Sequence, residues 1–286
     1  MVEIKRVGIC GSGIMGSGIA EVAGKAGFEV VLRSRSEEGA SAMLAGLDKS
    51  LAKQVEKGRL DDAERTAVRG RVRGVSDLAE LAECDLVLES IVEDLAPKLE
   101  LIGELDKICG DDAILATNTS TLSVKALAAA TGRPAQVCGI HFFNPAAAMP
   151  LVELVRAEKT SDDTLEAARR FAESCGKTVV DVRDQAGFVV NALLFPYLNN
   201  AVKLLEDGVA SRDDIDAAMK GGCNFPMGPL ELLDLVGLDT SLAIVEALHA
   251  GFDDPNYAPA PMLRRLVEEG KLGRKSGAGF YDYAKK

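Results

Sequence analysis

The sequence has few of the features that would place a chain in a membrane, on a nucleic acid or in an oxidising compartment. No apolar run approaches 18 residues, so we expect no membrane-spanning helix. No basic run is long enough to follow a phosphate backbone, and 33 lysines and arginines against 44 aspartates and glutamates give a net charge of −11, which argues against nucleic-acid binding. The six cysteines form no C-x-x-C pair, so we expect reduced thiols in a cytoplasmic protein and no metal site.

Strand and helix signals alternate through the first two thirds of the chain. Apolar, β-branched runs predict eight strands, at Arg6–Cys10, Glu29–Arg33, Val72–Val75, Asp85–Glu89, Ala113–Thr117, Gln136–His141, Leu151–Val155 and Thr178–Val182. Helical apolar spacing predicts helices at Met15–Ala26, Glu37–Lys57, Pro97–Ile108 and Thr164–Ser174. This alternation is typical of βαβ units, so we predict an α/β fold with a Rossmann-type, doubly wound and mostly parallel sheet.

Beyond Gly187 the strand signals stop and only helical apolar spacing continues. We therefore predict two domains, a dinucleotide-binding domain over residues 1–186 and an all-helical substrate and dimerisation domain over residues 187–286. A helical domain of this size buries little surface by itself. Because soluble oligomers are most often two-fold dimers, we expect a homodimer formed through the helical domain.

A glycine-rich turn directly follows the first predicted strand and opens a helix. In Gly11-Ser12-Gly13-Ile14-Met15-Gly16, the first glycine would make the turn, the second would admit a pyrophosphate and the third would let helix pack on strand. The helix N-terminus would face the anion. The alternative is a tight turn with no ligand, but the strand–turn–helix context favours a nicotinamide dinucleotide site.

The end of the second predicted strand departs from the usual NAD site. An acidic residue there normally binds the ribose 2′-hydroxyl, but this chain has Ser34 followed by Arg35. Without the acid a 2′-phosphate is not repelled, and Ser34 and Arg35 can donate to it. We therefore expect NADP(H) to be favoured, with NAD(H) as the alternative if Glu37 or Glu38 approaches the ribose.

The chain has only two histidines, and they differ in setting. His249 lies on a leucine- and alanine-rich helix, which favours a structural role. His141 ends a buried strand at the sheet edge where ligands bind. Glu153, twelve residues later, lies in an apolar strand and needs a partner. A His–Glu pair has the composition of a general base, although a structural histidine beside a surface glutamate is the alternative.

Several further motifs complete a pattern that resembles the L-3-hydroxyacyl-CoA dehydrogenases, from about residue 5 to residue 283. They are Gly11–Ala20, Asn118-Thr119-Ser120-Thr121-Leu122-Ser123, His141–Pro145 with Glu153, Gly187-Phe188-Val189-Val190-Asn191, Pro226-Met227-Gly228-Pro229 and Gly273–Tyr281. The resemblance is greatest to the stand-alone bacterial 3-hydroxybutyryl-CoA dehydrogenases.

The resemblance implies a role for each residue that matches a family motif. His141 would take the proton of the substrate's 3-hydroxyl and Glu153 would orient it, while Ser120 and Asn191 would bind the 3-oxygen or the thioester carbonyl. Capping of a local helix is the alternative for both Ser120 and Asn191. Further cofactor contacts are implied for Glu93, Lys98, Asn118 and Lys275. Ala192 departs from the arginine that often follows the catalytic asparagine in the family.

A basic helix face is the candidate binding surface for coenzyme A, which is itself highly anionic. Lys49, Lys53 and Lys57 recur every four residues and would form one stripe on a helix, although a plain solvated face is the alternative. The resemblance implies coenzyme A contacts at Ser50 and Lys57 on the same helix.

Three functions from different classes follow. The leading one is hydride transfer between a nicotinamide cofactor and C3 of a 3-hydroxyacyl-CoA, with acetoacetyl-CoA and (S)-3-hydroxybutyryl-CoA as the first pair to test. The second is a dehydrogenase of the same fold acting on a free hydroxy acid or sugar acid, against which the lysine stripe argues. The third is a non-catalytic nucleotide-binding protein, against which the combination of His141, Glu153, Ser120 and Asn191 argues.

Overall fold

The computed structural model describes residues 3–284, and the chain forms two compact units, Met1–Asp184 and Gln185–Lys286. The division falls two residues before the predicted domain boundary. Each unit has its own buried apolar cluster.

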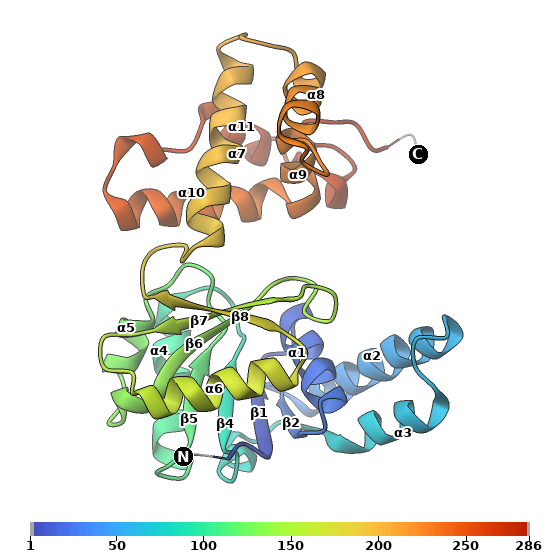
Figure 1. The fold of residues 1–286 in the computed structure, drawn as a ribbon, viewed down its shortest axis with the longest axis vertical. Helices are drawn as coiled ribbons and strands as arrows, with labels where there is room; N and C mark the ends of the chain where they lie inside the picture. Colours follow the sequence, from blue (N-terminus) through green and yellow to red (C-terminus); the bar gives the residue numbers. More distant parts are fainter. Residues whose placement is uncertain (1–2, 285–286) are drawn as a thin grey trace. The chain divides into compact units, whose positions relative to one another are not determined.

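The first unit is built on one eight-stranded sheet with the order β3-β2-β1-β4-β5-β6-β7-β8 (Figure 1). The pairs are parallel from β3 through β6, β7 runs antiparallel to β6, and β8 is parallel to β7. The predicted Rossmann-type fold class is confirmed. The strands are β1 (Arg6–Cys10), β2 (Glu29–Arg33), β3 (Val72–Val75), β4 (Leu86–Glu89), β5 (Ile114–Thr117), β6 (Val137–Phe142), β7 (Leu151–Arg156) and β8 (Thr178–Arg183).

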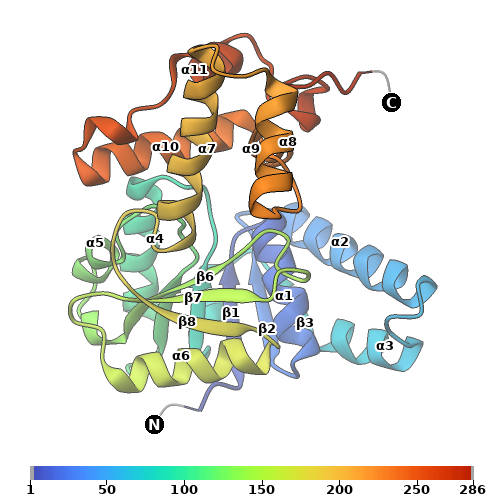
Figure 2. The same ribbon diagram turned by 45° about the horizontal axis from the view of Figure 1, so that its top comes forward.

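Helices cover this sheet, and α6 packs along β6, β7 and β8 (Figure 1). At the β3 edge, α2 and α3 lie side by side in both views (Figures 1 and 2). The sequence does not predict α3, because the charged residues of this helix leave little apolar periodicity. The helices of this unit are α1 (Ile14–Lys25), α2 (Glu37–Glu56), α3 (Asp62–Arg71), α4 (Leu95–Ile108), α5 (Val124–Ala129) and α6 (Asp162–Ser174), with the 3-10 turns η1 (Leu78–Leu81) and η2 (Pro134–Gln136).

Most helices of the first unit begin at a residue whose side chain caps the free backbone N–H groups. Ser36 caps α2, and Asp61 forms a capping box with Glu64 at α3. Ser123, not Ser120, caps α5, so the structure removes the capping alternative for Ser120. The N-cap residue of α1 is Gly13, and among the described residues no side chain caps this helix. Its first N–H groups are therefore the ones left for an anion.

The described part of the second unit contains helices and no β-strand, with α7 (Val190–Glu206) packed across α10 (Leu238–Phe252) (Figure 2). The other elements are α8 (Arg212–Cys223), α9 (Pro229–Val236), α11 (Pro261–Glu268), η3 (Pro255–Tyr257) and η4 (Arg274–Ser276). Within residues 3–284 no single helix is long and apolar enough to span a membrane, whereas α9 and α10 meet the length and composition test only as a pair bent by 102°.

Two buried aspartates explain two of the sequence motifs in the second unit. Asp216 accepts hydrogen bonds from the backbone N–H groups of Leu230 and Glu231 and so caps α9 from a neighbouring helix. A Cβ at Gly228 would collide with Asp216, which is why the Pro226–Pro229 motif needs a glycine there. Asp234 similarly accepts from the N–H groups that follow Gly279, at 2.8 Å each. Both motifs therefore stabilise the fold of this unit.

Candidate active site

The glycine-rich turn between β1 and α1 has the geometry of a pyrophosphate cradle. Gly11 has φ +142°, and a Cβ on it would collide with the carbonyl of Ser90. A Cβ on Gly16 would collide with the carbonyl of Gly11. At Gly13, by contrast, an added Cβ would meet no described atom within 4 Å. The turn is thus tightly packed at Gly11 and Gly16 and has free space at Gly13. Together with the uncapped start of α1, this geometry fits the phosphates of a dinucleotide.

The first two residues after β2, Ser34 and Arg35, present a cation and no carboxylate, and two glutamates follow at the start of α2. Arg35 is exposed, whereas the Arg33 guanidinium donates its Nε–H to the carbonyl of Ser76, at 3.1 Å. Ser34 is only 6% exposed and packs against Gly39 at the start of α2. Ser34 and Arg35 are the residues expected to bind a 2′-phosphate, and Arg35 is therefore the more accessible of the two. Glu37 in the first turn of α2 is also exposed.

The two strands β6 and β7 bring His141 and Glu153 together. Their antiparallel register pairs the two residues directly, and His141 Nδ1 lies 2.7 Å from Glu153 Oε2. Glu153 is fully buried and His141 is 6% exposed. With the Nδ1 proton donated to the carboxylate, the basic nitrogen of the neutral imidazole is Nε2. The pair can take up a proton without leaving an uncompensated buried charge.

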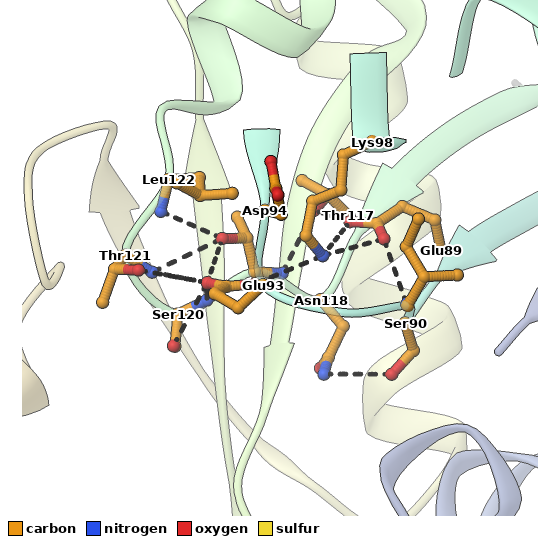
Figure 3. Close-up of polar contacts among 12 residues, drawn as sticks. Glu89, Ser90, Glu93, Asp94, Lys98, Thr117, Asn118, Ser120, Thr121 and Leu122 are labelled. Atoms are coloured by element: carbon orange, nitrogen blue, oxygen red, sulfur yellow. Dashed lines mark hydrogen bonds and ion pairs between the residues drawn. The ribbon is translucent and has the colours of Figure 1, made fainter. Parts of the chain in front are cut away.

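Asn118, which the resemblance assigned to the cofactor, ties the end of β5 to its neighbours. Its Oδ1 accepts a hydrogen bond from the Phe142 backbone N–H at 2.8 Å, next to His141. Its side-chain amide lies 3.5 Å from Ser90 Oγ, just after β4 (Figure 3). Asn118 therefore stands at the edge formed by the ends of β4, β5 and β6, where ligands of such sheets bind.

Glu93 holds the loop that carries Ser120 (Figure 3). One carboxylate oxygen, Oε1, accepts from Thr119 Oγ1 at 2.6 Å, from the Ser120 N–H at 2.8 Å and from the Thr121 N–H at 3.1 Å. Partial burial alone would raise the pKa of Glu93, but the Lys98 ammonium and the bonds from Thr119 and Ser120 outweigh it, so the pKa is lowered. Glu93 is accordingly ionised at neutral pH.

Lys98, which is expected to contact the cofactor, lies between two carboxylates. It is 1% exposed, and its Nζ lies 2.8 Å from both oxygens of Glu89 and 3.2 Å from Glu93 Oε2. In this structure the Lys98 ammonium is used on two protein carboxylates, and a contact with the cofactor stays a prediction. Glu89 is not among the predicted site residues, although a carboxylate at the end of the apolar run Leu86–Glu89 is the same kind of signal as Glu153 in its strand.

The expected coenzyme A residues lie on and just after α2. Lys53 is exposed on the helix, and Lys57 is exposed but follows the helix as its C-terminal cap, so the lysine stripe is only partly helical. Ser50 donates its hydroxyl hydrogen to Glu21 Oε2, at 2.6 Å. Glu21 is a buried residue of α1 that also accepts from Gln54 Nε2.

Two expected site residues belong to the second unit. Asn191 is buried in the first turn of α7, whose N-cap is Val189, so it is not the cap of its own helix. Lys275, in η4, forms an ion pair with Asp239, its Nζ lying 2.5 and 2.6 Å from the two carboxylate oxygens. His249 lies in the last turn of α10.

Comparison with known proteins finds one family over nearly the whole chain. Residues 6–185 match the model of the 3-hydroxyacyl-CoA dehydrogenase NAD binding domain, and residues 187–283 match that of the 3-hydroxyacyl-CoA dehydrogenase C-terminal domain. A probable 3-hydroxybutyryl-CoA dehydrogenase from Deinococcus radiodurans is 48% identical over 97% of this chain and 100% of its own length.

Two solved structures are also similar to the chain. An (S)-3-hydroxybutyryl-CoA dehydrogenase from Ralstonia eutropha is 41% identical, with a TM-score of 0.96 over 99% of this chain and 100% of that one. FadB2 from Mycobacterium tuberculosis is 46% identical, with a TM-score of 0.95 over 98% and 99%. The resemblance noted in the sequence is confirmed. The chain belongs to the 3-hydroxyacyl-CoA dehydrogenase family.

Proposed function

We propose that the chain interconverts acetoacetyl-CoA and (S)-3-hydroxybutyryl-CoA, with His141 as the general acid and base. The buried His141–Glu153 pair, 2.7 Å apart at the ligand-binding edge of the sheet, is the observation that carries this proposal. Several similar full-length proteins are named 3-hydroxybutyryl-CoA dehydrogenases, which supports the same substrate here.

The residues divide the work of the reaction. In the oxidising direction His141 removes the proton from the 3-hydroxyl, and Glu153 stabilises the imidazolium that forms. Ser120 and Asn191 hydrogen-bond the 3-oxygen or the thioester carbonyl and hold C3 in place. The nicotinamide, when bound, supplies the acceptor or donor of a hydride. In the reducing direction His141 returns the proton to the 3-oxygen.

A steady-state assay tests the proposed substrate. We expect turnover of acetoacetyl-CoA with a reduced nicotinamide cofactor, and little turnover of free acetoacetate, because the free acid lacks the coenzyme A contacts. Equal activity on the free acid would instead favour a dehydrogenase of free hydroxy acids. Cofactor binding without turnover of any acyl-CoA would favour a non-catalytic nucleotide-binding protein.

We propose that NADP(H) is the favoured cofactor. The exposed Arg35 at the end of β2 supports this, because a guanidinium matches the oxygens of a 2′-phosphate. The glycine cradle at Gly11, Gly13 and Gly16, together with the neighbouring Ser12, Ile14 and Met15, would hold the pyrophosphate.

The proposed binding surface for coenzyme A is the face of α2 that carries Lys53, together with Lys57. Both lysines are exposed, as an attraction to solvated phosphates requires. Ser50, whose only hydroxyl hydrogen is used on Glu21, would accept a hydrogen bond from the ligand and not donate one to a phosphate.

Changing Lys53 and Lys57 together to Ala should raise KM for acetoacetyl-CoA by about 3–30-fold, since each exposed charge contributes up to about 1 kcal/mol. We expect kcat and the KM for the cofactor to change less. Added salt should reduce the difference between variant and wild type. The control is the double variant Lys107→Ala/Lys159→Ala, which removes the same amount of charge from other exposed positions of the first unit. An unchanged KM at low salt would show that these lysines form a solvated helix face and do not bind coenzyme A.

We also propose that two copies associate through the helical unit. Leu193 is 71% exposed on α7, and Leu204, eleven residues later, falls on the same side of the helix and is 45% exposed. The two exposed leucines support this proposal, because contact with a second copy would bury them. Leu193→Glu combined with Leu204→Glu should convert a dimer into a monomer in light scattering, whereas Val180→Glu, in the first unit, should not. A monomeric wild type would contradict the proposal.

The cysteines support a reducing compartment such as the cytoplasm. All six lie among the described residues and are free thiols, and four of them are buried. Burial raises the pKa of the Cys84 and Cys138 thiols to about 12, so both are uncharged and unreactive at neutral pH. They pack as small apolar side chains.

A further inference from the structure

Lys177 is a buried lysine that the proposed reaction does not use. It follows α6 and directly precedes β8, and only 9% of it is exposed. Among residues 3–284 no carboxylate forms an ion pair with its ammonium, and burial lowers the pKa of the Lys177 side chain. A buried ammonium without a carboxylate is costly unless its hydrogens are bonded. The groups that accept these hydrogens therefore indicate what the buried lysine does.

Lys177 holds the loop at residues 143–150, which joins β6 to β7. Its Nζ donates to the carbonyl of Ala146 at 2.6 Å and to the carbonyl of Met149 at 2.8 Å. The residue after Lys177 donates its backbone N–H to the carbonyl of Pro150, at 2.7 Å. One short segment at the start of β8 thus binds three carbonyls of the loop that connects the strands of the candidate base.

The same loop contacts both the candidate base and the helix of the glycine-rich turn. At its start, the Phe143 ring packs on the His141 ring, with the ring centroids 4.6 Å apart. Further along, Ala146 is 3% exposed, and a Cβ on Gly18 of α1 would lie 3.2 Å from the Ala146 Cβ. The loop between β6 and β7 lies beside α1 in both views (Figures 1 and 2). A movement of the loop would therefore change the position of the base relative to this helix.

We propose that Lys177 is a positioning residue for the hydride transfer, holding His141 in place relative to the cofactor through the loop at residues 143–150. The inference rests on the proposed role of His141 as general acid and base. The ammonium fixes two carbonyls of the loop, and the loop fixes Phe143 and the imidazole on which it packs. Because a misplacement of about 1 Å can cost about 10²-fold in rate, a lysine that acts only through the loop can control turnover.

The test is a double-mutant cycle between Lys177→Met and His141→Gln. Methionine keeps most of the length of the side chain and removes both hydrogen bonds to the loop. We expect Lys177→Met alone to lower kcat for acetoacetyl-CoA by about 10–100-fold, but by less than about 3-fold when it is added to His141→Gln. KM for acetoacetyl-CoA and the dissociation constant of the reduced cofactor should change by less than about 3-fold. Lys159→Met, at an exposed lysine of the same unit, is the matched control and should keep the wild-type kcat.

The outcomes separate a positioning role from other roles. Equal losses of kcat with and without His141 would mean that Lys177 only supports the fold, which would overturn the inference and leave the proposed function standing. A wild-type kcat for Lys177→Met would overturn it as well. The same holds if the cofactor dissociation constant rises along with the loss of kcat, because Lys177 would then serve cofactor binding. Near-normal turnover of His141→Gln would overturn the role of His141 and the inference together.

A second variant and a second measurement cover a failure of Lys177→Met to fold. Lys177→Gln removes the charge but keeps an amide that can donate to a loop carbonyl. Because the chain has only two histidines, the ring signals of ¹⁵N-histidine-labelled protein report on His141 and His249 separately in NMR spectra. We expect Lys177→Gln to shift the His141 signals and to leave those of His249 in α10 unchanged. Unshifted His141 signals would overturn the inference.

Discussion

Replacing His141 with Gln is expected to lower kcat for acetoacetyl-CoA by about 10²–10⁴-fold, the usual contribution of a general acid and base. The glutamine cannot carry a proton to and from the 3-oxygen. Glu153→Gln should cost a comparable amount, because a neutral partner 2.7 Å from Nδ1 no longer stabilises the imidazolium. Ala at position 141 should behave like Gln.

Two controls accompany these variants. The cofactor dissociation constant should stay near the wild-type value, because the glycine cradle is on other elements. His249 is the other histidine of the chain and lies on α10, and the variant His249→Gln should retain activity. A His141 variant with near-normal turnover would rule out the proposed base.

The wild-type enzyme is expected to prefer NADPH to NADH by about 10–100-fold in kcat/KM, since one charge-assisted hydrogen bond to the 2′-phosphate contributes about 1.5–3 kcal/mol. Because Ser34 is nearly covered by the start of α2, Arg35 should carry most of this preference. Arg35→Ile alone should therefore remove most of it. Ser34→Asp combined with Arg35→Ile should move the preference towards NADH, because the new carboxylate repels the phosphate and binds the 2′-hydroxyl.

The measurement is kcat/KM for both reduced cofactors with acetoacetyl-CoA in all three proteins. A wild type that prefers NADH would contradict the proposal. The same holds if the double variant keeps the wild-type preference. Arg73→Ile, on the neighbouring strand β3, changes an arginine outside the β2–α2 turn and should leave the cofactor preference unchanged.

Local signals were enough to predict the parallel part of the sheet. The strands at β1, β2, β4 and β5 are apolar at successive positions, because both faces of a parallel strand are covered, and this pattern needs no knowledge of the neighbours. The glycine motif could also be predicted from the sequence, since the close contacts of Gly11 and Gly16 lie within their own strand–turn–helix unit or just beside it. The His141–Glu153 pair was inferred because a buried carboxylate needs a partner.

Contacts between segments far apart in the chain could not be predicted from the sequence. The antiparallel direction of β7, the cover over Lys98 and the capping of α9 by Asp216 depend on which element packs beside which. Lys98 illustrates the reason. In sequence it is a charged residue near the start of a helix, typical of a surface, and only the placement of Glu89 at the end of β4 makes burial of its ammonium favourable. The fold class, the glycine cradle and the candidate base can therefore be predicted from the sequence, because they depend on local pattern and on the need to pair a buried charge. The buried contacts that hold these features in place depend on how the elements pack, because they require distances between elements that no local pattern contains.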